Sequence, residues 1–159
     1  MNSTKKAGLI IGILVSLYLA ALSISGSFGG EGVKYLKYII LMIGLMVFYQ
    51  LHVKNWDYNA FMGKFISSAA EISLISGVIV AITNTLLFIA EPTWAIQKYN
   101  LAADTIGQVL LIDFVLIVEM VVLGLMSSFI IFPLHKNTPK KPAPDAAPTA
   151  NRYKRAKQG

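Results

Sequence analysis

The sequence contains no cysteine, which excludes disulfide bonds, thiolate metal sites, cysteine nucleophiles and lipid anchors attached to cysteine. Charged residues are also scarce: they make up 14% of the chain, whereas a soluble domain has about 25%. Hydrophobic residues make up 55% of the 159 positions. This combination favours a small, single-domain membrane protein over a soluble enzyme or binding module.

Sequence motifs that carry chemistry are missing as well. The chain has no HExxH, GxSxG, P-loop or dinucleotide-binding glycine pattern, so we predict neither an enzyme nor a cofactor. The two histidines, His52 and His135, are expected at helix ends as interfacial residues. A metal site formed by them with Asp57 would require the fold to bring all three together, so we predict no metal.

The net charge of +6 comes largely from a basic C-terminal tail. Half of the 14 basic residues follow Leu134: Lys136, Lys140, Lys141, Arg152, Lys154, Arg155 and Lys157. Stacking aromatics between the charges, which nucleic-acid binding would need, are limited to Tyr153. We interpret the tail as facing lipid or setting orientation, and predict no nucleic-acid partner. Its richness in Pro, Ala and Lys predicts disorder over residues 135–159.

Four apolar stretches are long enough to cross the hydrocarbon of a membrane, which is about 30 Å thick and requires about 20 residues of helix. They cover about residues 7–28, 33–51, 65–90 and 106–132. The sequence therefore predicts an all-α polytopic membrane protein, with an antiparallel bundle of four transmembrane helices over residues 7–134. Pro133 is expected to stop the last helix.

Two of these stretches have an alternative interpretation. The second is short, because only the 14 residues between Lys37 and His52 lack charge. It spans the membrane if Lys37 snorkels outward with Lys34 or is paired inside; otherwise it is a re-entrant helix. The first follows Lys5 and Lys6 and has features of a signal peptide, but its length favours a retained anchor.

Basic residues fall unevenly on the two sides of such a bundle. With residues 1–6 inside, the inner side holds 11 basic residues, namely the seven of the tail and Lys5, Lys6, Lys54 and Lys64. The outer side holds three: Lys34, Lys37 and Lys98. Because basic residues gather on the cytoplasmic side, we expect both ends of the chain to be cytoplasmic.

The third stretch carries a small residue at every fourth position, which predicts a close helix–helix contact. This stripe consists of Ala69, Ser73, Gly77, Ala81 and Thr85, with Asn84 on the same side. Helices in lipid associate through close backbone approach and interhelical hydrogen bonds. The alternative is a chance distribution of small residues. Gly8 and Gly12 in the first stretch form a single GxxxG pair, which is a weak signal of the same kind.

The fourth stretch has a matching face. Asp113, Gly124 and Ser128 lie within about 60° of one another on a helical wheel. In an antiparallel hairpin, Asn84 and Asp113 come to nearly equal depth, and either group is costly in lipid without a partner. We therefore predict that Asn84 and Asp113 meet, with Lys37 also within reach of Asp113.

Three carboxylates inside the stretches are candidate ion-binding groups: Glu119, Asp113 and Glu71. Glu119 stands out because it lies near the bilayer midplane and points about 120° away from the Asp113 face. Two roles are open for it, proton or cation binding and a structural hydrogen bond to a neighbouring helix or a second copy. Its charge state is open as well, because burial favours the neutral acid. Glu71 is expected to snorkel to the cytoplasmic interface.

Three segments carry a resemblance to a known family. They are Lys5 to Leu9 (KKAGL), Tyr58 to Phe65 (YNAFMGKF) and Glu119 to Ser128 (EMVVLGLMSS). Over about residues 4–136, the chain resembles the four-helix inner-membrane proteins grouped as domain of unknown function 4199, found mainly in Bacteroidota. The resemblance implies a four-helix topology and no particular activity.

A structural or accessory subunit is the leading hypothesis for function. It would bind a second copy or another membrane protein through its small-residue helix faces, in contact with membrane lipids. The alternative is a small proton- or ion-coupled transporter or channel subunit that uses Glu119. An intramembrane enzyme is least favoured, because no nucleophile–base pair or metal set is visible.

Overall fold

Four long helices account for nearly all of the chain that the computed structural model describes, which is residues 2–25, 31–56, 61–90 and 106–135. They are α1 (Ser3–Ser25), α2 (Glu31–His52), α3 (Phe61–Ala90) and α5 (Ile106–His135). A short 3-10 helix, η1 (Val53–Asn55), follows α2. All four long helices are long and apolar enough to cross a membrane. The predicted all-α, four-helix architecture is confirmed.

The helix bounds differ from those that hydropathy predicts. α1 begins at Ser3 and α3 at Phe61, each four residues before the apolar stretch. The 30 residues of α3 extend about 45 Å. This exceeds the hydrocarbon thickness of about 30 Å. α5 runs through Pro133 to His135, so the predicted stop at Pro133 is wrong. Only two helical residues follow this proline, so it removes a backbone hydrogen bond where the helix is already ending.

Other predictions fall outside the described residues. The outer connection over residues 91–104 lies there, as do Asp57 and the basic tail after His135. α2, by contrast, is fully described as a helix of 22 residues. This length suffices to cross the hydrocarbon and favours a spanning helix over a re-entrant one.

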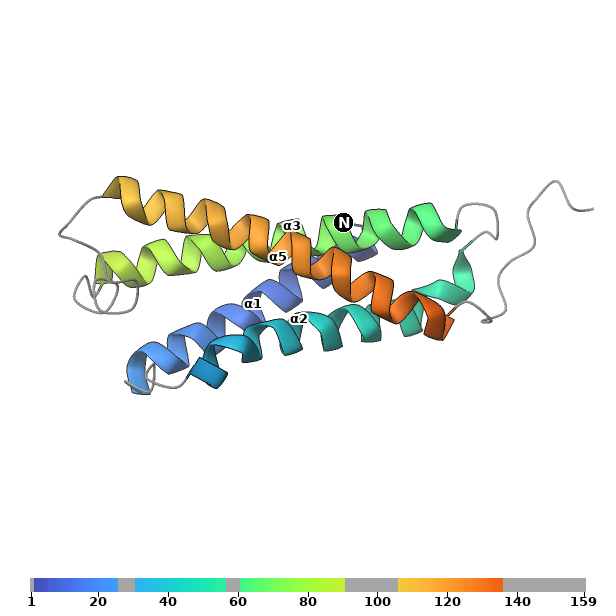
Figure 1. Cartoon of the computed structure of the whole chain (residues 1–159), viewed down its shortest axis with the longest axis horizontal. Helices are drawn as coiled ribbons and strands as arrows, with labels where there is room; N and C mark the ends of the chain where they lie inside the picture. Colours follow the sequence, from blue (N-terminus) through green and yellow to red (C-terminus); the bar gives the residue numbers. More distant parts are fainter. Residues whose placement is uncertain (1, 26–30, 57–60, 91–105, 136–159) are drawn as a thin grey trace, which may run out of the picture.

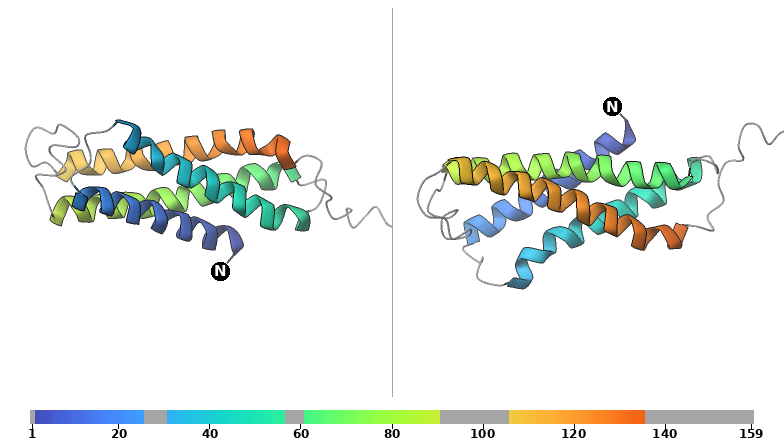
Figure 2. Two further views of the ribbon diagram at one scale, coloured as in Figure 1. Left: turned by 90° about the horizontal axis from the view of Figure 1, so that it is seen from below. Right: turned by 45° about the horizontal axis from the view of Figure 1, so that its top comes forward.

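α3 lies between α1 and α5 and contacts both extensively. α1 and α3 run in the same direction, because Gly8 faces Ile75 and Gly12 faces Ile79 at a constant offset. A Cβ atom on Gly8 would lie 3.0 Å from the carbonyl oxygen of Ile72. The GxxxG pair therefore lets the backbone of α1 approach that of α3. Figure 2 shows α1 crossing α3 obliquely.

α5 runs antiparallel to α3 and packs on its small-residue stripe. A Cβ atom on Gly77 would lie 3.2 Å from Cα of Ile117. Nearer the other end, a Cβ atom on Gly124 of α5 would lie 2.7 Å from Cβ of Ser73. The predicted tight contact of the stripe is therefore present, and the two helices run side by side (Figure 1).

α2 completes the bundle by packing against α1 and α5. It meets α3 at the end near η1, where aromatic side chains gather. The rings of Tyr49 and Phe65 stack with centroids 3.7 Å apart, and the Tyr49 hydroxyl donates to the Phe65 carbonyl oxygen at 2.8 Å. The Trp56 ring lies edge-on to both rings. The ring centroids of Phe132 of α5 and Phe65 are 5.4 Å apart. This aromatic cluster ties α2, α3 and α5 together at one end.

Large apolar side chains also cover the outside of the bundle. On α5, for example, exposed residues include Leu111, Phe114, Phe129 and Ile130, each more than half exposed. In water such a surface would be a strong aggregation liability. It suits a bundle surrounded by hydrocarbon.

Replacing Gly77 with leucine tests the stripe. The added side chain would meet the α5 backbone at Ile117, so we expect a loss of about 1–3 kcal/mol in the free energy of unfolding. The measurement is reversible unfolding of the full chain in mild detergent. Gly63→Leu is the matched control on the same helix, because nothing lies within 4 Å of a Cβ atom there. Equal effects of the two substitutions would contradict the packing account.

Candidate functional site

Glu119 of α5 forms a cluster with two consecutive residues of α2. The Lys37 ammonium donates to Oε2 of Glu119 at 3.0 Å, and the Tyr38 hydroxyl donates to Oε1. Both carboxylate oxygens are therefore occupied. The Lys37 ammonium also lies 4.6 Å from the centre of the Tyr38 ring, a cation–π distance. We call these three residues the Glu119 cluster.

This cluster explains how α2 carries a lysine inside the bundle. The Lys37 side chain is 13% exposed and that of Glu119 is 35% exposed. Two isolated charges at these positions would be costly in lipid, but the pair is neutral as a unit and each charge has a hydrogen-bonded partner. The predicted condition for a spanning second helix, Lys37 paired inside, is confirmed.

The predicted reach of Lys37 to Asp113 is wrong. Asp113 and Glu119 project from different sides of α5, about 120° apart by helix geometry. α2 packs on the side that carries Glu119, whereas Asp113 faces α3. Lys37 therefore pairs with Glu119 and not with Asp113.

Asp113 forms a second cluster with two consecutive residues of α3. The Asn84 amide donates to Oδ1 of Asp113 at 2.8 Å, and the Thr85 hydroxyl donates to Oδ2. Asn84 is 1% exposed and Asp113 is 6% exposed. The predicted meeting of Asn84 and Asp113 is thus confirmed, and Thr85 adds a donor. We call these three residues the Asp113 cluster.

The remaining small residues predicted to pack between helices are buried within the chain. Ala69, Ser73, Gly77 and Ala81 of α3 are buried, as are Gly124 and Ser128 of α5. The Ser128 hydroxyl donates to the Leu125 carbonyl oxygen of its own helix at 2.7 Å, so it does not bond across the interface. The small-residue faces of α3 and α5 therefore pack against each other within one copy of the chain.

Two polar contacts between α1 and α3 were missed in the sequence. The Ser76 hydroxyl donates to the Gly8 carbonyl oxygen, and the Thr83 hydroxyl donates to Ser16 Oγ, both at 2.9 Å. Ser76 and Thr83 are seven residues apart and share the α3 face that contacts α1. That seven-residue spacing of hydroxyl side chains, together with Gly8, was the feature of the sequence that could have predicted the contact between α1 and α3.

Glu71 and the two histidines join neither cluster. Glu71 is partly buried on α3. His52 Nδ1 lies 3.0 Å from the Phe48 carbonyl oxygen, and His135 Nδ1 lies 3.3 Å from that of Ile131. Each ring therefore contacts its own helix four residues back. Within the described ranges, no group of three His, Asp or Glu side chains is placed to hold a metal ion.

The candidate functional site therefore consists of two carboxylate clusters on α5, one facing α2 and one facing α3. Comparisons of this chain with protein families, curated proteins and solved structures found no match. The resemblance to domain of unknown function 4199 stays a prediction. Function must be argued from the geometry of the clusters and the surface of the bundle.

A double-mutant cycle tests the coupling inside the Glu119 cluster. Lys37→Leu and Glu119→Leu each leave one charge without its partner, so each should lower the free energy of unfolding by about 1–3 kcal/mol. The double variant should lose less than the sum, because replacing a whole buried ion pair with apolar groups is close to neutral. Unfolding in mild detergent measures all four proteins. If the loss in the double variant equals the sum of the two single losses within about 0.5 kcal/mol, the two residues are not coupled.

Proposed function

We propose that this chain is a non-catalytic structural or accessory protein of a bacterial inner membrane, with both ends cytoplasmic. The observation that carries the proposal is the pairing of the two carboxylates on α5. Glu119 accepts from Lys37 and Tyr38, and Asp113 accepts from Asn84 and Thr85. All four donors lie on other helices of the same chain, so these polar groups hold the bundle together.

The charges of the Glu119 cluster support this role over cation transport. A cation that bound Glu119 would have to displace the Lys37 ammonium at 3.0 Å, and that ammonium would then be left charged inside the bundle. Asp113 offers no better site, because neutral donors occupy both of its oxygens in a tight interface. A cation could bind Asp113 only after these hydrogen bonds were broken, and the free energy needed to break them would offset the free energy of binding.

The outward surface of α5 is the contact surface that we propose for a partner or a second copy. With the small-residue stripe buried, a partner meets side chains such as Phe114, Val118 and Phe129. Helices in lipid gain little from hydrophobicity alone, so such a contact would rest on shape and packing. Accessory binding through this surface replaces the expected binding through the small-residue faces.

Proton-coupled transport is a second candidate, and one observation favours it. The Glu119 side chain is 35% exposed, so the outer edge of the cluster is reachable from outside the bundle. A proton could pass between Glu119 and Tyr38, with Lys37 holding the charge balance. Four helices enclose little pore, so this role would need an oligomer.

Purification and reconstitution separate the two candidates. The structural proposal expects the full chain to co-purify in mild detergent with a partner or a second copy. It also expects liposomes that contain the chain to pass protons no faster than empty liposomes, read by an enclosed pH-sensitive dye. Proton flux that disappears in a folded Glu119→Gln variant would overturn the proposal and establish transport. Glu71→Gln is the matched control for removing a carboxylate.

The proposed orientation can be read with single cysteines, because the chain has none of its own. We expect Ser3→Cys and Gly159→Cys to react with a membrane-impermeant maleimide only after cells are lysed. Thr93→Cys, in the predicted outer connection, should react in intact cells whose outer membrane has been permeabilised. Reaction of one chain end from each side would contradict the four-span layout.

A further inference from the structure

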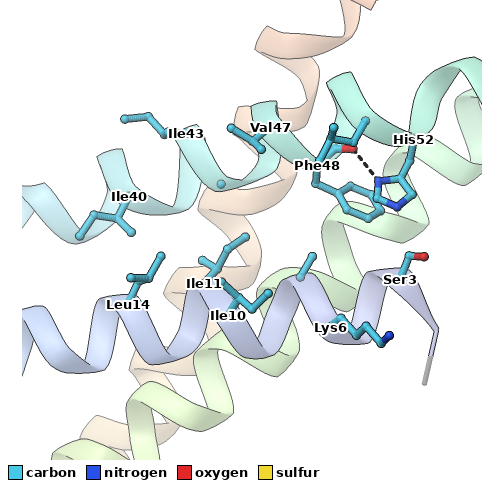
Figure 3. A pocket seen from close by; sticks show the side chains of 13 residues that line it. Ser3, Lys6, Ile10, Ile11, Leu14, Ile40, Ile43, Val47, Phe48 and His52 are labelled. Atoms are coloured by element: carbon cyan, nitrogen blue, oxygen red, sulfur yellow. Dashed lines mark hydrogen bonds between the residues drawn. The ribbon is translucent and has the colours of Figure 1, made fainter.

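An apolar groove of about 510 Å³ runs between α1 and α2. Its walls include Ile10 and Leu14 of α1 and Ile43 and Val47 of α2, as Figure 3 shows. These two helices are antiparallel and touch closely where Gly44 admits Ile11: a Cβ atom on Gly44 would lie 2.6 Å from two carbons of that side chain. Elsewhere the contact between them is sparse, which leaves the groove open at the outside of the bundle.

The polar residues of the groove all lie at one end. They are Ser3 and Lys6 in the first turns of α1 and His52 at the end of α2, seen at one side of Figure 3. The contact of His52 Nδ1 with the Phe48 carbonyl oxygen at 3.0 Å directs its Nε2 away from the helix. The groove thus combines a hydrocarbon-lined length with a cationic, hydrogen-bonding end.

We propose that this groove binds one anionic phospholipid, with an acyl chain between α1 and α2 and the phosphate at Lys6. The charge of the groove end argues for an anionic head group: Lys6 lines it, and Lys54 is exposed at the same end of the bundle. A phosphate there can accept hydrogen bonds from the Lys6 ammonium and the Ser3 hydroxyl. Anionic lipids are abundant in the cytoplasmic leaflet, on the side where this end is proposed to lie.

The size of the groove suits a hydrocarbon chain. The wall from Lys6 to Leu14 extends about 12 Å along α1. The groove holds about 510 Å³, within the range of sites that bind small ligands. A flexible hydrocarbon chain fits this space. The inference rests on the proposed orientation of the chain and not on its proposed structural role.

The test is native mass spectrometry of the full chain in mild detergent, titrated with phosphatidylglycerol or phosphatidylcholine. We expect one phosphatidylglycerol to be retained in preference to phosphatidylcholine. Lys6→Gln should weaken that retention about fivefold, the contribution of one basic residue near an anionic surface. Lys5→Gln is the matched control, since it removes the same charge from the same helix without lining the groove.

A substitution that fills the groove with a large side chain gives a second, independent test. Val47→Trp should abolish retention, because the indole occupies the space of the acyl chain. Val118→Trp, on an equally exposed position of α5, should leave it unchanged. Unchanged binding in Val47→Trp, or no preference between the two lipids in the wild type, would overturn the proposal. So would efficient disulfide cross-linking of a Val47→Cys variant, because a second copy would then occupy the groove.

Discussion

Polar side chains inside a membrane must find their partners within the protein, and the arrangement of α5 depends on this constraint. Asp113 is held by α3 and Glu119 by α2. Because the two carboxylates project from α5 about 120° apart, satisfying both fixes the rotation of this helix about its own axis. A turn of α5 that improved one cluster would break the other. The polar contacts therefore specify one packing among several that apolar surfaces alone would allow.

Close packing of helix backbones also stabilises the bundle, and most of this packing involves α3. One face of α3 presents the small residues that admit α5, and a second face, about 100–120° around the helix, presents Ser76 and Thr83 to α1. Glycines on the partner helices, Gly12 and Gly124, complete the contacts. Dispersion forces act only over short distances, so removing side chains at these crossings strengthens attraction between whole helices.

The sequence predicted the four helices, the α3 stripe and the Asn84–Asp113 contact, because each depends on composition or spacing along one or two helices. It did not predict that Glu119 pairs with Lys37 and Tyr38, since the side on which α2 packs is set by tertiary contacts. An adjacent Lys and Tyr near a helix start resembles an interfacial anchor. The parallel contact of α1 with α3 was also missed, because it joins helices that are not consecutive.

The position of α2 has a mechanical consequence. It is fastened to its neighbours at two places, by Lys37 and Tyr38 at one end and by the stacked ring of Tyr49 at the other. These fastenings are 12 residues apart, or about 18 Å along the helix. The stretch between them carries the fully buried Leu41 and Leu45 and meets α1 closely at Gly44. Apolar packing alone holds α2 between these two places, so a small shift of this stretch would widen or narrow the groove beside α1 while both attachments stay intact.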